Sequence, residues 1–190
     1  MASDVDICNS ALNMIGASNI ISLTEDSKSG RVCNQRFPFV RDAVMRAHPW
    51  NCIIRRASLA QLADTPAYEY AYQYQLPADP YCLRVLDVEN EVAQGVTYVI
   101  EGRSLLTDEG SINIRYVARI TDANEYDAML TETLSARMAH EISYGLANST
   151  THTEQLWNLY LMKLSEARFA DATEGTPAEL VSDNFTTVRL

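Results

Sequence analysis

The first periodic segment of the chain is an apolar stripe at helical spacing. It occupies residues 4–16, and its members are Cys8, Ala11, Leu12 and Ile15. Ser3 or Asp4 can cap the start of such a helix, and the glycine at position 16 suits its end. We therefore predict an amphipathic helix over this segment.

A second stripe predicts a longer helix over residues 28–47. Its members are Cys33, Phe37, Val40, Val44 and Ala47. Polar residues 24–27 supply a turn and an N-cap before it. Pro38 lies inside the segment and is expected to kink or interrupt the helix, but the stripe stays in phase across it, so we retain a single helix.

The helical pattern ends at a corner, His48-Pro49-Trp50-Asn51. Proline disfavours the α conformation in the residue before it, so the helix should stop near Ala47. The following residues are β-branched or apolar, as in a strand. Trp50 is expected to fill the joint between a helical layer and a sheet, because its large ring can be buried while its indole N–H finds a partner.

The middle of the chain alternates in the manner of strands separated by short turns. We expect strands at residues 51–61, 68–76, 81–88, 97–101, 104–106 and 112–117, with a hairpin turn at Glu101-Gly102-Arg103. The turns are too short for parallel crossovers, so the strands should form an antiparallel meander.

Four tyrosines alternate with other residues in one of these strands: Tyr68, Tyr70, Tyr72 and Tyr74. Strict alternation would place them on one face of the strand. Such a row could stack against sugars, or it could be a half-buried face covered within the fold or by another subunit. The second interpretation is favoured, since aromatic rows are more often buried than free.

Helical spacing returns in the last third of the chain. Leu130, Leu134, Met138, Ile142 and Leu146 predict a helix over residues 124–147, with Asp122 as its cap. A final helix over residues 153–173 is apolar on nearly every side. A helix of that kind is buried on more than one face, so we expect one face to contact another subunit, through Trp157, Tyr160 and Leu161, with the tyrosine strand as the second contact.

These patterns define an α+β protein. Residues 1–50 and 122–174 should form one discontinuous four-helix body, and residues 51–121 an antiparallel β domain. Residues 175–190 have no helical period and should form an extended C-terminal tail. The tail carries spaced apolar residues, Val181, Phe185, Val188 and Leu190, and such a segment is either loose or docked on a partner.

Charge and composition narrow the functional classes. The 190-residue chain has a net charge of −10, with seven Lys/Arg against five Asp/Glu up to residue 62 and eight against twenty after it. Such an acidic chain is not expected to bind the DNA backbone, although like charge suits a pore through which DNA slides. The N-terminus lacks the pattern of a signal peptide, and no apolar run is long enough to span a membrane. We expect the four cysteines to be reduced core thiols.

Several segments, in order, resemble one known family. ALNMIGASNIISLTEDS, RFPFVRDAVMRAHPWNCIIRRASL and YAYQYQLPADPYCLRVLDV are similar to phage tail tubular protein A, and INIRYVARITDANEYDAMLTETLSARMAHEISY is weakly similar. The resemblance covers residues 4–148 and contains no catalytic signature.

The resemblance implies a structural virion protein, the gatekeeper or adaptor of the head-tail connector. Such a protein forms a dodecameric ring between the portal protein and the tail nozzle, and genome DNA crosses the ring's lumen during ejection. It would be made in the host bacterial cytoplasm and located at the portal vertex of the virion. The resemblance also implies that the C-terminal tail reaches the portal, and we expect Val181, Phe185, Arg189 and Leu190 to make that contact.

Catalytic and metal-binding motifs are not expected. Residues 140–144 read HEISY, which lacks the second histidine of the H-E-x-x-H zinc motif. We therefore expect no catalytic residue, cofactor or metal. Two alternatives stay open: a glycosidase that degrades a surface polysaccharide with carboxylates such as Asp108/Glu109 or Asp87/Glu89, and a monomeric binding module.

Overall fold

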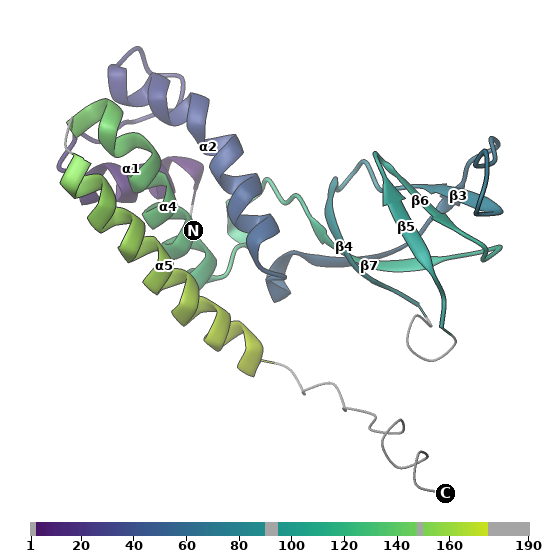
Figure 1. Ribbon diagram of the computed structural model, residues 1–190. Helices are drawn as coiled ribbons and strands as arrows, with labels where there is room; N and C mark the ends of the chain where they lie inside the picture. Colours follow the sequence, from purple (N-terminus) through teal and green to yellow (C-terminus); the bar gives the residue numbers. More distant parts are fainter. Residues whose placement is uncertain (1–2, 90–94, 148–149, 175–190) are drawn as a thin grey trace, which may run out of the picture.

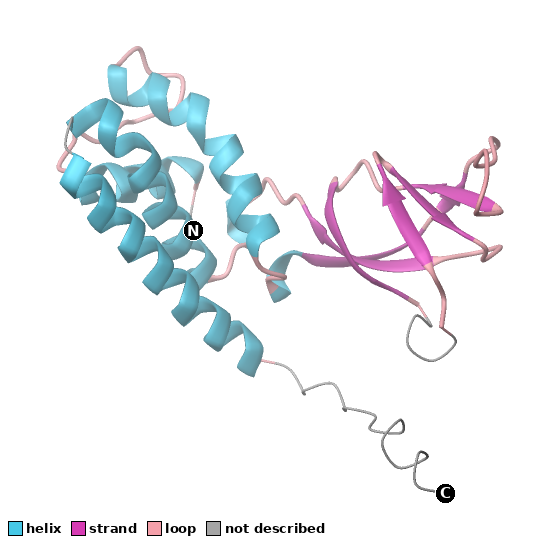
Figure 2. Ribbon diagram, viewed as in Figure 1, coloured by secondary structure: helices cyan, strands magenta, loops and turns pink. Residues whose placement is uncertain are grey.

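The computed structural model describes residues 3–89, 95–147 and 150–174, which form a helical body beside a β lobe (Figure 1). The α+β class predicted from the sequence is confirmed. The body contains helices from both ends of the described chain, and the lobe is formed by the residues between them (Figure 2). The helices are α1 (Asp4–Met14), α2 (Lys28–Ala47), α4 (Ala128–Ala147) and α5 (Thr150–Thr173).

Side-chain caps fix where the first two helices begin. The Asp6 backbone N–H donates to Ser3 Oγ at 3.1 Å, and the Ser3 backbone N–H donates to Asp6 Oδ2 at 3.0 Å, which is a reciprocal capping box. Ser27 Oγ accepts from the Gly30 N–H at 3.0 Å. The predicted bounds of α2 are confirmed, and the helix runs on through Pro38 without interruption.

The start of α4 differs from the prediction. Asp122 caps a short 3₁₀ turn, Ala123–Glu125, by accepting from the Asn124 N–H at 2.9 Å. The α-helix itself begins only at Ala128, and Asp127 Oδ2 accepts from the Met129 N–H at 3.0 Å. Asp122 therefore caps the 3₁₀ turn and Asp127 the α-helix, whereas the sequence predicts a single helix capped by Asp122.

Helix α4 is the centre of the helical body, because it packs against α1, α2 and α5. Its predicted apolar stripe is confirmed at four positions, where the side chains are fully buried: Leu130, Leu134, Met138 and Ile142. The buried stripe stabilises the body mainly through the apolar surface it removes from water.

Seven strands form the described part of the lobe. They are β1 (Ile54–Ser58), β2 (Ala60–Gln61), β3 (Tyr72–Gln75), β4 (Cys82–Val88), β5 (Tyr98–Glu101), β6 (Ser104–Thr107) and β7 (Asn113–Ala118). One sheet has the order β1-β7-β4 and the other β2-β3-β6-β5, and all pairings are antiparallel. The predicted hairpin between β5 and β6 is confirmed, with Gly102 at φ +59° in its turn.

The simple meander and the single long strand at residues 51–61 are corrected. The first strand pairs with the last, with Ile54 opposite Val117. Asn51–Ile53 forms a 3₁₀ turn, and the chain passes from one sheet to the other at Leu59. Leu59 is buried, and its N–H donates to the Ile112 carbonyl at 3.0 Å, which continues the register of β1 on β7 by one residue before the chain joins the other sheet.

Trp50 fills the joint between body and lobe, as predicted. Its side chain is buried, and its indole Nε1–H donates to the Val44 carbonyl at 3.1 Å. The His48 ring packs edge-on against it, with ring centroids 5.0 Å apart. The last carbonyls of an α-helix have no N–H donor within the helix, and the indole N–H of Trp50 supplies a donor to one of them, that of Val44.

Candidate functional site

An apolar face on the outside of α5 is the first candidate interaction surface. Leu161, Met162 and Phe169 are 45%, 51% and 76% exposed. Met162 and Phe169 are about two turns apart on one side of the helix, and Leu161 borders that side. The helix is therefore only partly covered by its own chain, as its unusual apolar content predicts.

The opposite side of α5 packs on α4, and this corrects one predicted interface residue. Tyr160 is buried within the chain, so it belongs to the core and offers little surface to a partner. Trp157 is half-buried beside it, with ring centroids 5.3 Å apart. The Arg137 guanidinium lies 4.8 Å from the Trp157 ring and 5.3 Å from the Tyr160 ring, which holds both aromatics against α4.

The predicted row of four tyrosines is also corrected. Strand β3 begins only at Tyr72, and Tyr68 and Tyr70 precede it in a turn where the Tyr70 N–H donates to the Tyr68 carbonyl at 2.9 Å. Tyr74 is buried, its hydroxyl donates to the Glu109 carbonyl at 2.7 Å, and burial raises its pKa. Tyr74 is therefore a core residue.

Tyr68 occupies the most exposed position of the row. Its side chain is 80% exposed at the end of the lobe, and the next residue, Glu69, has a positive φ of 73°. That conformation is uncommon outside glycine and indicates a tight, specific turn. Asp108 supports the turn by accepting from the Ala71 N–H at 2.9 Å.

The corner after α2 binds the end of α5. Asp171 Oδ2 lies 2.8 Å from His48 Nε2, and its Oδ1 accepts from the Asn51 N–H at 2.9 Å. The Asn51 side chain donates in return to the Asp171 carbonyl at 2.8 Å, and Arg168 donates to the Ala47 carbonyl at 3.2 Å. This cluster fixes the position and direction of the last turns of α5, and so of Phe169.

A cleft of about 620 Å³ lies where α2 meets the lobe. Four arginines line it: Arg46, Arg84, Arg103 and Arg119. Asp42 is the one carboxylate among the described residues that line it, and it pairs with Arg119. The cleft is thus strongly positive in a chain whose net charge is −10.

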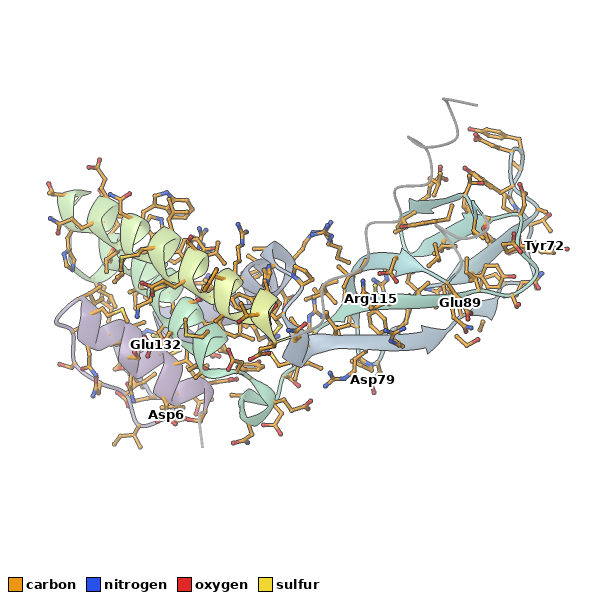
Figure 3. The ribbon with its side chains drawn as sticks, turned by 90° about the horizontal axis from the view of Figure 1, so that it is seen from below. Asp6, Tyr72, Asp79, Glu89, Arg115 and Glu132 are labelled. Carbon is orange, nitrogen blue, oxygen red and sulfur yellow. The ribbon has the colours of Figure 1, made fainter. Side chains whose placement is uncertain are left out.

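Three of the four carboxylates considered for sugar hydrolysis, Asp87, Glu89 and Asp108, have structural partners. Asp87 pairs with Arg115, whose Nε lies 2.7 Å from Oδ2, and Glu89 accepts from the Asn113 side chain at 2.5 Å. Asp108 supports the Tyr68 turn as described above. Figure 3 shows Glu89 and Arg115 on the lobe. These bonds orient the carboxylates for packing of strands and turns.

The HEISY segment forms part of the contact between α4 and its neighbours. His140 Nδ1 lies 3.1 Å from the Thr153 carbonyl, and Glu141 forms ion pairs with Arg36 and Arg137. Burial opposes ionisation of Glu141, but the hydrogen bonds and charges of the two arginines outweigh it and lower its pKa. Within the described ranges, no group of three or more His, Cys, Asp or Glu residues could hold a metal ion.

Sequence reasoning missed two features of these surfaces. Phe169 lay on the same side of the final helix as Met162, a signal available from its spacing of seven residues. The arginine cleft had no sequence signal, since its members come from distant segments. The predicted portal contacts, Val181, Phe185, Arg189 and Leu190, lie outside the described residues.

No model of a known protein family matches this chain, and no curated protein matches it. Among the residues that the structure describes, no helix has the length and apolar content needed to cross a membrane.

Proposed function

We propose that this protein is a structural, ring-forming adaptor of a phage head-tail connector, similar in role to tail tubular protein A. Copies of the chain form a dodecameric ring that joins the portal protein to the tail, and genome DNA passes through the lumen without sequence-specific binding. The protein acts through its surfaces and requires no cofactor.

The outer face of α5 is the observation that carries this proposal. Three large apolar side chains, Leu161, Met162 and Phe169, are exposed together on a helix whose end is fixed by the Asp171 cluster. Burial of each partly exposed side chain in a subunit contact would contribute about 1 to 2 kcal/mol. A surface that is apolar and held rigid suits a permanent contact between subunits.

Two further properties support the same role. The acidic charge of the chain would keep DNA from adhering to the wall of a channel. A closed ring also needs two different surfaces on each subunit, since its contacts are heterologous. The α5 face on the body and the exposed turn around Tyr68 on the lobe are both candidates for surfaces that contact neighbouring subunits, and they need not contact each other.

The test is the mass of the assembly formed by the full chain, measured by native mass spectrometry and analytical ultracentrifugation. We expect the wild type to form a ring, and the double variant Leu161→Asp/Phe169→Asp to be a folded monomer. Ile21→Asp is the matched control, because Ile21 is 94% exposed in the connector after α1 and should tolerate the change. A wild type that stays monomeric, or a double variant that still forms the ring, would overturn the proposal.

A further inference from the structure

The arginine cleft carries more positive charge than its own chain neutralises. Arg46, Arg84, Arg103 and Arg119 each bring a guanidinium to the cleft, and Asp42 pairs with only one of these four. Like charges held this close repel one another, and an anionic partner would relieve that repulsion. The cleft is therefore suited to bind carboxylates.

Several of these arginines are held in place by the backbone. Arg103 donates to the Cys82 carbonyl at 2.7 Å and to the Pro77 carbonyl at 2.5 Å, and Arg46 donates to the Leu83 carbonyl. The guanidiniums of Arg103 and Arg119 also lie over the Tyr81 ring, 3.9 and 4.3 Å from its centroid. These contacts immobilise the charged groups before any partner arrives, which reduces the entropic cost of binding.

The opposite end of the lobe has the opposite charge. We define the acidic tip as residues 62–71 and 107–111, which contain no lysine or arginine. Its four carboxylates are all exposed: Asp64, Glu69, Asp108 and Glu109. Strands β3 and β6 run between the acidic tip and the arginine cleft. Tyr72 pairs with Thr107 at the tip, and Gln75 pairs with Ser104 beside Arg103 of the cleft. Figure 1 shows the tip at the end of the lobe away from the helices, and Tyr72 marks it in Figure 3.

The acidic tip also carries an exposed aromatic side chain, Tyr68, in a turn of fixed conformation. The Tyr68 side chain is 80% exposed and belongs to a turn fixed by the positive φ of Glu69 and by the bond from Ala71 to Asp108. Tyrosine and arginine are the residue types most enriched where binding energy concentrates in protein interfaces. A cleft of about 620 Å³ is large enough to hold such a side chain with carboxylates around it.

We propose that the acidic tip of one copy docks in the arginine cleft of the next copy, with Tyr68 entering the cleft and the carboxylates facing its guanidiniums. This contact deepens the ring proposal above and rests on it. Because the tip and the cleft are different surfaces at opposite ends of the lobe, the contact is head-to-tail, and repetition of it can close a ring. Charge complementarity also favours the pairing of tip with cleft over tip-to-tip or cleft-to-cleft contacts, in which like charges would face one another.

The test reverses each charge separately and then mixes the variants. Arg84→Glu reverses an exposed charge in the cleft, and Asp64→Lys/Glu109→Lys reverses the tip. We expect each variant alone to associate at least about tenfold more weakly than the wild type, as charge reversal at a contact predicts. An equimolar mixture should restore association, because each reversed surface then meets its complement. Association of the wild type should weaken as salt is raised.

Controls separate folding from binding and this contact from the ring itself. Arg56→Glu makes the same charge change on β1, outside the cleft, and should leave association unchanged; circular dichroism and melting temperature establish that every variant is folded. Arg84→Gln, which removes the charge without reversing it, should give an intermediate loss. A wild type that assembles while the reversed variants assemble equally well, or a mixture that fails to restore association, would overturn this contact but leave the ring proposal standing. A wild type that is monomeric throughout would overturn both.

Discussion

Replacement of Asp171 by alanine should destabilise the protein by releasing the end of α5 from the corner. The Asp171 carboxylate accepts from the Asn51 N–H at 2.9 Å and from His48 Nε2 at 2.8 Å, and its side chain is only 12% exposed. A carboxylate in the last turn of a helix is disfavoured by the helix dipole, by about 0.3 to 1 kcal/mol. Its position there is explained by the two bonds it makes across to the corner.

The magnitude follows from those bonds. Hydrogen bonds to a charged group contribute about 1.5 to 3 kcal/mol each, and the alanine variant also leaves the Asn51 N–H without its acceptor. After subtraction of the dipole term, we expect Asp171→Ala to lower the free energy of unfolding by about 2 to 5 kcal/mol. Asp171→Asn keeps one acceptor oxygen and the shape of the side chain, so its cost should be about half as large.

Urea denaturation would measure the loss, and hydrogen exchange would locate it. Exchange should accelerate in the last two turns of α5 and at Asn51, while the lobe remains protected. Glu174→Ala is the control, because Glu174 is exposed and accepts only a long 3.4 Å contact from Asn51; it should change stability by less than about 0.5 kcal/mol. If Asp171→Ala costs no more than this control, the corner does not hold the helix.

Two other predictions concern stability. Gly30→Ala should destabilise the protein by about 1 to 3 kcal/mol, because a Cβ there would lie 2.7 Å from the Glu25 carbonyl oxygen. In Gly145→Ala, the added Cβ on α4 meets no atom within 4 Å, so this variant should be neutral or stabilising by up to about 1 kcal/mol. Thermal melts would compare the two variants, and equal effects would contradict the packing argument. Glu141→Gln should reduce the loss of stability in acid: the folded pKa of Glu141 lies below its ordinary 4.5, so its contribution is present above pH 4.5 and lost as the pH falls through the folded value. Urea midpoints measured across that range should fall less steeply for the variant than for the wild type, and parallel curves would refute this assignment.

The helices were the most predictable part of the fold, for a physical reason. Their apolar stripes and caps are local, so the bounds of α2 and the burial of Trp50 could be read from neighbouring residues. The start of α4 was placed too early because Asp122 and Asp127 are both competent caps, and only the packed structure selects between them.

Long-range features could not be read in the same way. The point at which the chain leaves one sheet for the other, after Leu59, depends on pairing with residues near Ile112, more than fifty residues away. Tyr68 and Tyr70 fit the alternation of a strand but lie in a turn, because Asp108 binds the backbone at Ala71. The arginine cleft likewise brings together side chains from α2, β4, the β5–β6 turn and the end of β7, and no local sequence pattern predicts that these segments are close in space.

The pairing of β1 with β7 means that the polypeptide enters and leaves the lobe through one narrow neck. Ile54, where the chain enters the lobe, lies opposite Val117, where it leaves. These two positions are neighbours in space although the chain between them is long. The lobe can therefore be regarded as a cassette: it could be excised and replaced by a short linker, or exchanged for another sheet, without altering the spacing of the helices on either side. Specificity for a neighbour and the architecture of the scaffold would then be free to evolve separately.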